Sequence, residues 1–193
     1  TILLKRDAFG TIRRTCVPGT SGDVDCVERD TTQAARGARW LARRLAAREA
    51  RALQALRHLP GVPRLVSWNG RRLLRSWQPG LPLQKSAGVG PAYFREALRL
   101  LRRLHAAGIV HNDLAKEPNW LVTPDGQPAL VDFQLAARPR HRGCVFRMLA
   151  HDANAGMGPV LERLPQLAEQ LQQAAQNLTA ALGEKGYGQS SDF

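Results

Sequence analysis

The chain has 193 residues, 44% of them hydrophobic, which suits one domain or two small lobes and excludes wholesale disorder. No apolar run approaches the roughly 20 residues needed to cross a bilayer. Nothing resembles a signal peptide, and the three cysteines lack metal-ligand spacing, so we expect free thiols in a reducing cytoplasm.

The net charge is unevenly distributed along the chain. Residues 1–150 carry 26 Lys and Arg against 11 Asp and Glu, whereas residues 151–193 carry 2 against 5. A body this basic favours anionic partners such as nucleotide, nucleic acid or anionic lipid. For any single arginine, however, a solvated helix position is the simpler interpretation.

The first half of the chain predicts strands, one long helix and a hairpin. Three β-branched segments, TILLK, GTIRRTCV and DVDCVE, indicate short strands. Thr31 and Thr32 are candidate caps for a helix that reaches about Leu59. Four leucines recur in it at helical spacing: Leu41, Leu45, Leu53 and Leu56. The segment RLVSWNGRRLLRSW then predicts two strands around an Asn69-Gly70 turn.

The second half predicts helices around another hairpin. QPGLPL forms an irregular connector, and a helix is expected from about Pro91 to Ala107. NWLVT and PALVDF follow as a hairpin across PDGQ, and the chain from Gly143 onward has a mostly helical pattern. The fold class is therefore α+β, with a cleft at the junction of a strand-rich and a helical lobe.

Two nearby segments, HNDLAKEPN and VDFQ, concentrate polar side chains next to short strands. Transfer of a phosphoryl group to a hydroxyl needs Mg²⁺ held by oxygen ligands, a base near the acceptor, and fixed phosphates. Asp113, Asn119 and Asp132 offer two carboxylates and an amide for the first two of these tasks. Each aspartate could also be a turn or cap residue.

Several motifs resemble those of the protein-kinase-like superfamily. LHAAGIVHNDL is similar to the run that leads into a catalytic loop, VDFQLA stands where the DFG motif would stand, and REARALQAL resembles the helix with the paired glutamate. SWQPGLPL looks like the hinge that receives adenine. The resemblance covers about residues 3–150. Within that superfamily, the chain most resembles the small bacterial kinases grouped with RIO kinases and lipopolysaccharide (Kdo/heptose) kinases.

The resemblance implies a two-lobed, protein-kinase-like fold. Residues 1–78 would form a small strand-rich N-lobe with one long helix. Residues 79–152 would form a reduced helical C-lobe with the catalytic loop and a metal-binding hairpin. Residues 153–193 would be a helical tail whose role is open.

The resemblance also assigns roles in the C-lobe. Asp113 would be the catalytic base, and His111 would brace its loop. Asp132 and Asn119 would bind Mg²⁺ at the phosphates of ATP, and Lys116 would neutralise the transferred phosphate.

Five residues would form the nucleotide pocket. Glu49 would pair with a basic residue of the N-lobe, for which Arg29 lies twenty residues earlier in the chain. Gly10 would belong to the loop over the phosphates, and Trp77 and Gln78 to the hinge. Glu49 could instead be a helix-surface acid, and Trp77 could equally fill the core.

The chain departs from the family pattern at several points. Asn119 follows Asp113 by six residues instead of five, so the loop must bulge or Glu117 must replace the amide as a ligand. Arg29 stands where the family has a lysine, and it would bind phosphate as a planar fork. DFQ lacks the glycine of DFG, which predicts a constitutive enzyme without that switch.

We expect an ATP- and Mg²⁺-dependent kinase that phosphorylates a hydroxyl. The resemblance implies a glycolipid acceptor, a lipopolysaccharide core sugar at the inner face of the bacterial inner membrane, which a basic body would contact peripherally. A RIO-like serine/threonine kinase with a protein acceptor and a nucleotide-binding pseudokinase are the alternatives. A nucleic-acid-binding role ranks last, because the arginines lack interleaved aromatic residues.

Overall fold

The computed structural model describes residues 1–19, 22–86, 88–114 and 116–138. All of them belong to one compact unit of the chain, residues 1–157. The tail predicted for residues 153–193 and the helices expected beyond Gly143 lie outside the described residues. Among the described helices, none is long and apolar enough to cross a membrane.

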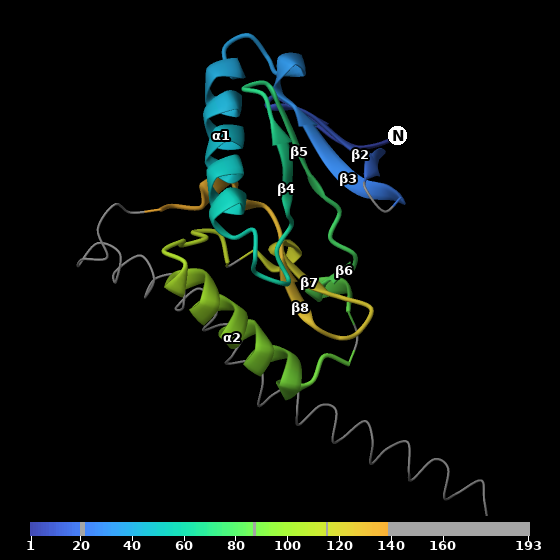
Figure 1. Ribbon diagram of the computed structural model, residues 1–193, viewed down its shortest axis with the longest axis vertical. Coiled ribbons are helices and arrows are strands. Elements are labelled where there is room, and N and C mark those ends of the chain that lie inside the picture. The colour runs from blue at the N-terminus through green and yellow to red at the C-terminus, as the bar shows by residue number, and fades with distance from the viewer. Residues whose placement is uncertain (20–21, 87, 115, 139–193) are drawn as a thin grey trace, which may run out of the picture. The chain divides into compact units, whose positions relative to one another are not determined.

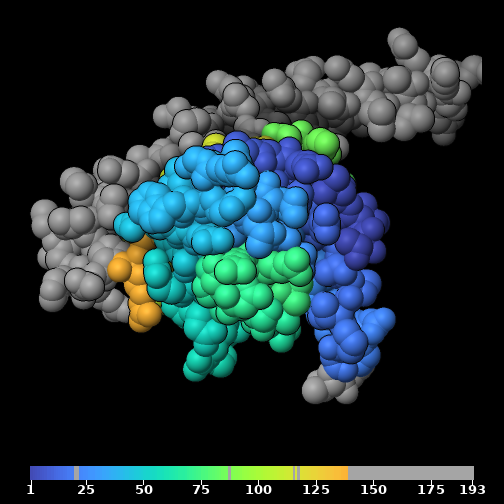
Figure 2. All heavy atoms as spheres, turned by 90° about the horizontal axis from the view of Figure 1, so that it is seen from above, coloured from blue at the N-terminus to red at the C-terminus, as the bar shows by residue number. Residues whose placement is uncertain are grey.

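A five-stranded antiparallel sheet forms the strand-rich part, in the order β1-β2-β3-β5-β4. Its strands are β1 (Ile2–Asp7), β2 (Gly10–Gly19), β3 (Gly22–Asp30), β4 (Leu65–Trp68) and β5 (Arg72–Ser76). The three N-terminal strands and the Asn69-Gly70 hairpin match the prediction. Viewed from above, β1 to β3, helix α1 and the β4–β5 hairpin make up one continuous surface (Figure 2).

Helix α1 (Arg39–Ala55) packs against β4 and β5 (Figure 1). It begins later than the sequence predicts, because the Asp30 side chain caps a short 3-10 turn, Thr31–Gln33, by accepting a hydrogen bond from the Thr32 amide at 2.8 Å. It also ends earlier than Leu59, at Ala55.

The buried face of α1 includes the later leucines that the sequence indicated but not the first. Leu41 is 40% exposed, whereas Ala42, Ala46, Glu49 and Leu53 form a buried stripe at helical spacing. Small alanines let the helix lie close to the sheet. A carboxylate, Glu49, is thereby placed in the middle of an apolar face.

The second part of the fold joins helix α2 (Pro91–Ala106) to a three-stranded sheet. The strand order is β6-β7-β8, with β6 (Leu81–Pro82), β7 (Trp120–Val122) and β8 (Pro128–Leu130). The predicted irregular connector therefore contributes a strand. Gly80 makes this pairing possible: its φ is +148°, and a Cβ there would lie 2.7 Å from the Val122 carbonyl oxygen.

Helix α1 also contacts the segment that follows β8, a 3-10 turn at Phe133–Leu135. Arg48 Nε donates a hydrogen bond of 2.8 Å to the Ala136 carbonyl across this contact. The core side chains Leu53, Ile109 and Phe133 are each fully buried. The two parts of the fold thus meet along α1, beside Glu49 and Asp132.

Candidate active site

The HNDLAKEPN loop (residues 111–119) is anchored through His111. The ring is fully buried and packs edge-on against Phe133, with centroids 4.6 Å apart. Its Nε2 lies 3.0 Å from the Val131 carbonyl oxygen, which can only accept, so Nε2 carries the proton. Burial lowers the pKa of His111 and keeps the imidazole neutral. The structure therefore ties the start of the loop, at His111, to the segment that holds Val131 and Phe133.

Asp113, Lys116 and Asn119 converge within this loop. Lys116 Nζ donates to Asp113 Oδ2 at 2.9 Å, and the hydrogen bond to Asp113 raises the pKa of Lys116. Asn119 Nδ2 donates to the Asp113 carbonyl oxygen at 2.8 Å and to Asp113 Oδ2 at 3.1 Å. The loop ends in a 3-10 turn, Glu117–Asn119. The side chain of Glu117, the alternative ligand, lies outside the described part of the structure.

Asp132 enters the same region from the end of β8. The Val131 amide donates to the Asn119 carbonyl oxygen at 3.0 Å, which joins the two segments backbone to backbone. Asp132 has a φ of +64° and a ψ of +67°, a left-handed conformation that costs energy in a non-glycine residue and is common at functional sites. Gln134 Nε2 donates to Asp132 Oδ1 at 2.6 Å and fixes the carboxylate. The residue that replaces the glycine of DFG therefore orients the aspartate.

These donors fit a magnesium ion. The amide nitrogen of Asn119 is engaged by Asp113, so the amide would offer its oxygen to a cation. Asp132 has one carboxylate oxygen bonded to Gln134 and a second for a metal. Carboxylate and amide oxygens are the hard ligands that Mg²⁺ prefers.

Behind Asp132 lies a buried ion cluster, which we call the Glu49 cluster: Glu49, Arg29 and Arg75. Glu49 is 0% exposed, with Arg75 Nε 3.2 Å from Oε1 and Arg29 Nε 3.6 Å from Oε2. Neither carboxylate oxygen has a partner in hydrogen-bond geometry among the described residues. Burial raises the pKa of Glu49, the two arginines oppose this shift, and Asp132 adds to it.

Sequence reasoning missed Arg75 altogether. In the sheet, Val27 lies opposite Arg75 and Arg29 lies opposite Leu73. Directly opposed residues share a face, so Arg29 and Arg75 are diagonal neighbours on the face that α1 covers. The alternation of β5 was the available signal, because Arg75 lies two residues after the fully buried Leu73.

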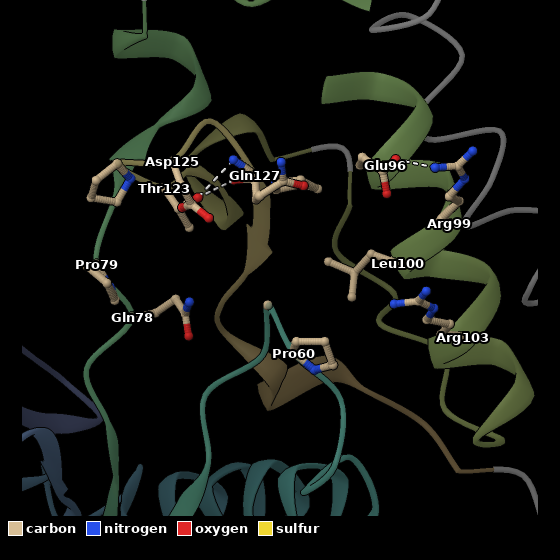
Figure 3. Close-up of a pocket in the computed structure, with 13 residues that line it drawn as sticks. Pro60, Gln78, Pro79, Glu96, Arg99, Leu100, Arg103, Thr123, Asp125 and Gln127 are labelled. Carbon is tan, nitrogen blue, oxygen red and sulfur yellow. Dashed lines mark hydrogen bonds and ion pairs between the residues drawn. The ribbon is translucent and has the colours of Figure 1, made fainter. Parts of the chain in front are cut away.

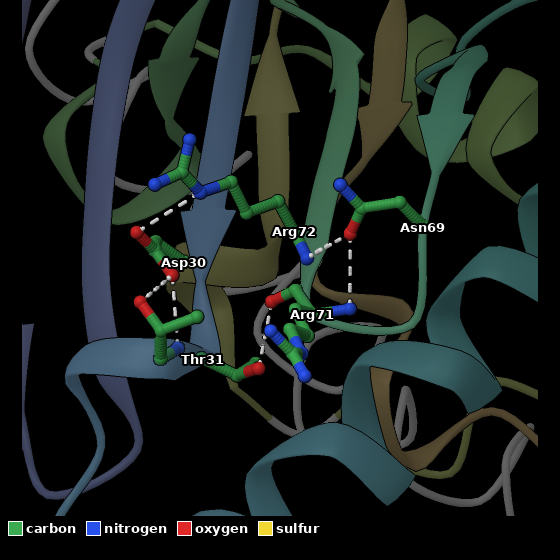
Figure 4. A network of polar contacts seen from close by, with 6 residues as sticks. Asp30, Thr31, Asn69, Arg71 and Arg72 are labelled. Carbon is green, nitrogen blue, oxygen red and sulfur yellow. Dashed lines mark hydrogen bonds and ion pairs between the residues drawn. The ribbon is translucent and has the colours of Figure 1, made fainter.

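A polar network fixes the end of β3 just beyond Arg29 (Figure 4). Arg72 Nε lies 3.2 Å from Asp30 Oδ2, and the Thr31 amide and hydroxyl both donate to the Arg71 carbonyl oxygen, at 3.0 and 2.7 Å. The Asn69 side chain accepts from the Arg71 and Arg72 amides and shapes the turn. The strand that carries Arg29 is thereby tied to the strand that carries Arg75.

Trp77 and Gln78, predicted to receive adenine, face different surroundings. The Trp77 amide donates to the Asp25 carbonyl oxygen at 2.8 Å, and the guanidinium of Arg14 stacks 4.4 Å from the centre of its ring. Arg14 also forms an ion pair with Asp25. Gln78 lines a cavity of about 340 Å³ bounded by the α1–β4 loop, α2 and the β7–β8 turn (Figure 3). Arg14 is a second residue that the sequence did not single out.

Gly10 lies at the turn between β1 and β2. Its φ is +123°, and a Cβ there would lie 2.2 Å from the Asp30 carbonyl oxygen. The close approach of these two backbones is sufficient to require glycine.

Comparison with known proteins identifies the family. The RIO domain family matches residues 23–155, more than half of the chain, and the chain therefore belongs to that family. Among solved structures, it is similar to the Rio2 kinase from Chaetomium thermophilum, crystallised as an ADP/Mg²⁺-phosphoaspartate complex, with a TM-score of 0.58 and 19% identity. The match covers 78% of this chain and 52% of that one, so this chain spans about half the length of the Rio2 chain. No curated protein matches its sequence.

The predicted fold is thereby confirmed as α+β and protein-kinase-like, and so is the RIO part of the resemblance. Nothing in the comparisons supports the lipopolysaccharide-kinase part.

Proposed function

We propose that this protein is an ATP- and Mg²⁺-dependent kinase that transfers the terminal phosphoryl group to a hydroxyl. The observation that carries the proposal is the convergence of Asp113, Lys116 and Asn119 in one hydrogen-bonded loop, joined by backbone to Asp132. Membership of the RIO family and the ADP and Mg²⁺ in the Rio2 structure support it.

In this proposal Asp113 accepts or orients the acceptor proton, and Lys116 neutralises charge on the transferring group. Asp132 and Asn119 hold the metal, which supplies charge stabilisation at the phosphates. His111 acts only through the loop that it supports, since its imidazole is buried and neutral.

The nucleotide would lie between the two lobes, which we place at residues 1–78 and 79–152. Arg29 would bind its phosphates and Glu49 would hold Arg29, while Trp77 and Gln78 would lie near the base. Gly10 is the weakest of these assignments, because packing against Asp30 already accounts for it.

For the acceptor, the RIO family favours a protein serine or threonine over a lipopolysaccharide sugar. The sugar, the inner face of a bacterial membrane and peripheral lipid contact remain proposals supported only by the basic charge and the motif resemblance. A pseudokinase that binds nucleotide without transfer is the second candidate, favoured by Arg29 in place of a lysine.

The first test measures thermal stabilisation by ATP with and without Mg²⁺. Ligand at about 100 times its dissociation constant adds roughly 2.7 kcal/mol to the free energy of unfolding. We expect Mg²⁺ to strengthen binding, and Asp132→Asn to abolish that gain. The matched control is Asp23→Asn, at an exposed position of β3, which should behave like the wild type. If ATP stabilises none of the three proteins, the proposal fails.

The second test identifies the acceptor with γ-labelled ATP. Label on added protein or on the chain itself supports the RIO-type kinase, and label on glycolipid alone supports the sugar. Label that hydroxylamine removes would indicate an aspartyl phosphate, the species named in the Rio2 complex. Nucleotide binding without any transfer would identify a pseudokinase.

A further inference from the structure

The Glu49 cluster contains more positive charge than its carboxylate requires. Two guanidinium groups face one carboxylate, and in the described part of the chain Glu49 is the only acidic group at ion-pair distance from either arginine. Arg29 and Arg75 are 11% and 13% exposed, so both charges are largely removed from water. A buried arrangement of this kind is stable only if its charges compensate one another.

The two arginines do not hold Glu49 equally. Arg75 Nε lies 3.2 Å from one oxygen and Arg29 Nε lies 3.6 Å from the other, and neither contact has hydrogen-bond geometry. Arg75 therefore makes the closer contact, and Arg29 the looser one.

Position in the sheet separates the two further. Arg29 lies one residue before Asp30, at the end of β3 beside the β1–β2 turn. Arg75 lies two residues before Trp77, in the middle of the sheet between Val27 and Leu65. Arg29 is thus the arginine beside the turn that carries Gly10, which the proposed function places over the phosphates.

We propose that Arg75 is a positioning residue: it neutralises Glu49 and so leaves the Arg29 guanidinium able to bind the nucleotide phosphates. This inference rests on the proposed kinase function and deepens it. In the usual arrangement one lysine serves both the glutamate and the phosphates. Here two arginines divide those tasks. An arginine that had to hold a buried carboxylate alone would exchange it for phosphate only with difficulty, since the carboxylate would be left unpaired.

The test compares the affinity of Mg²⁺·ADP, by titration calorimetry, for four full-length proteins. They are the wild type, Arg75→Met, the control Arg72→Met, and the double variant Glu49→Gln with Arg75→Met. Arg72 is matched to Arg75 because it lies on the same strand and pairs with one acid, Asp30, but alternation puts it on the other face.

We expect Arg75→Met to weaken Mg²⁺·ADP about tenfold or more, because Arg29 becomes committed to Glu49, whereas Arg72→Met changes affinity less than about twofold. Removing the carboxylate as well frees Arg29, so the double variant should recover to within about threefold of the wild type. A merely structural Arg75 would lower stability without this recovery of affinity.

Three results would overturn the inference. One is that Arg75→Met binds Mg²⁺·ADP as the wild type does. Another is that the double variant binds as weakly as Arg75→Met, which would mean that Arg75 contacts the nucleotide itself. If Arg75→Met does not fold, the double variant is compared with Glu49→Gln alone, and a further loss of affinity there also overturns it. Failure of the wild type and of Arg72→Met to bind at all would instead refute the proposed function, and the inference with it.

Discussion

The two polar clusters of the site, the HNDLAKEPN loop and the Glu49 cluster, differ in how they meet water and in how far apart their members lie in the chain. In the loop, Asp113 and its partners lie within six residues, and the Lys116 side chain is 64% exposed. In the Glu49 cluster, a fully buried carboxylate meets two arginines from different strands. One cluster is local and partly solvated, since the Asp113 side chain is 14% exposed and Asn119 is buried. The other is non-local and desolvated.

The difference suits the two clusters to different tasks: the loop to phosphoryl transfer, and the Glu49 cluster to holding side chains in position. A partly exposed loop can exchange the Lys116 hydrogen bond for one with an acceptor, as the proposed proton transfer requires. A buried carboxylate instead holds its neighbours in fixed geometry, at the expense of stability. Mutations in the loop should therefore change turnover, and mutations in the cluster should change affinity and pH-dependent stability.

The largest expected effect belongs to the loop. Asp113→Asn should lower kcat by about 100- to 10,000-fold, the usual contribution of a general base, with little change in nucleotide affinity. Steady-state kinetics with labelled ATP would measure it. If Asp113→Asn lowered nucleotide affinity as much as kcat, the loop and the Glu49 cluster would not have the separate roles proposed.

His111→Ala should come next. Loss of the buried ring leaves a cavity beside Phe133 and the Val131 carbonyl without its donor, so we expect a loss of about 2–4 kcal/mol in the free energy of unfolding. Urea denaturation measures this loss. His58→Ala, at an exposed position, is the control and should change stability by less than about 0.5 kcal/mol.

A smaller effect is expected for Glu49→Gln, a change in how the free energy of unfolding depends on pH. The pKa of Glu49 is raised above its ordinary value of 4.5, so the folded state binds a proton at Glu49 more tightly than the unfolded state does. Glu49 therefore favours stability at low pH. That contribution is lost as the pH rises through the folded pKa, by up to about 1.4 kcal/mol per pH unit. Glu49→Gln should remove this slope, measured by denaturation between pH 5 and 8.

The pH dependence of stability expected from His111 has the opposite sign to that of Glu49, so the two contributions can be distinguished. Its pKa is lowered from 6.5, so its contribution is present above that value and is lost as the pH falls. A slope that is unchanged in Glu49→Gln would show that the carboxylate is not the group that titrates.

The smallest expected effect concerns Gln134→Ala. Loss of its 2.6 Å hydrogen bond leaves Asp132 less well oriented, and Mg²⁺-dependent stabilisation by ATP should fall by about 0.5–1.5 kcal/mol. Gln54→Ala, on the exposed face of α1, should have no such effect. Thermal shift with and without Mg²⁺ distinguishes the two.

The sequence predicted what is local and missed what depends on register. HxD, the downstream asparagine and the DF pair lie in two short segments, so the motif alone located them. Arg75 and Arg14 act across strands, and their roles depend on which residues lie opposite each other. The start of α1 was misplaced because Asp30 caps a separate 3-10 turn at Thr31–Gln33, and α1 itself begins at Arg39 without a side-chain cap. Its buried face was only partly predicted, because Ala42, Ala46 and Glu49 join Leu53 there and Leu41 is exposed.

The hydrogen bond from Arg48 to the Ala136 carbonyl has a mechanical consequence. Arg48 precedes Glu49 in the chain, and Ala136 lies four residues beyond Asp132, so the bond fastens the middle of α1 to the segment that carries Asp132, the proposed metal ligand. Rotation of one lobe against the other would pivot at this point. The distance between Glu49 and Asp132 would then change least during such a motion. A contact that opens the cleft would have to act at the ends of α1.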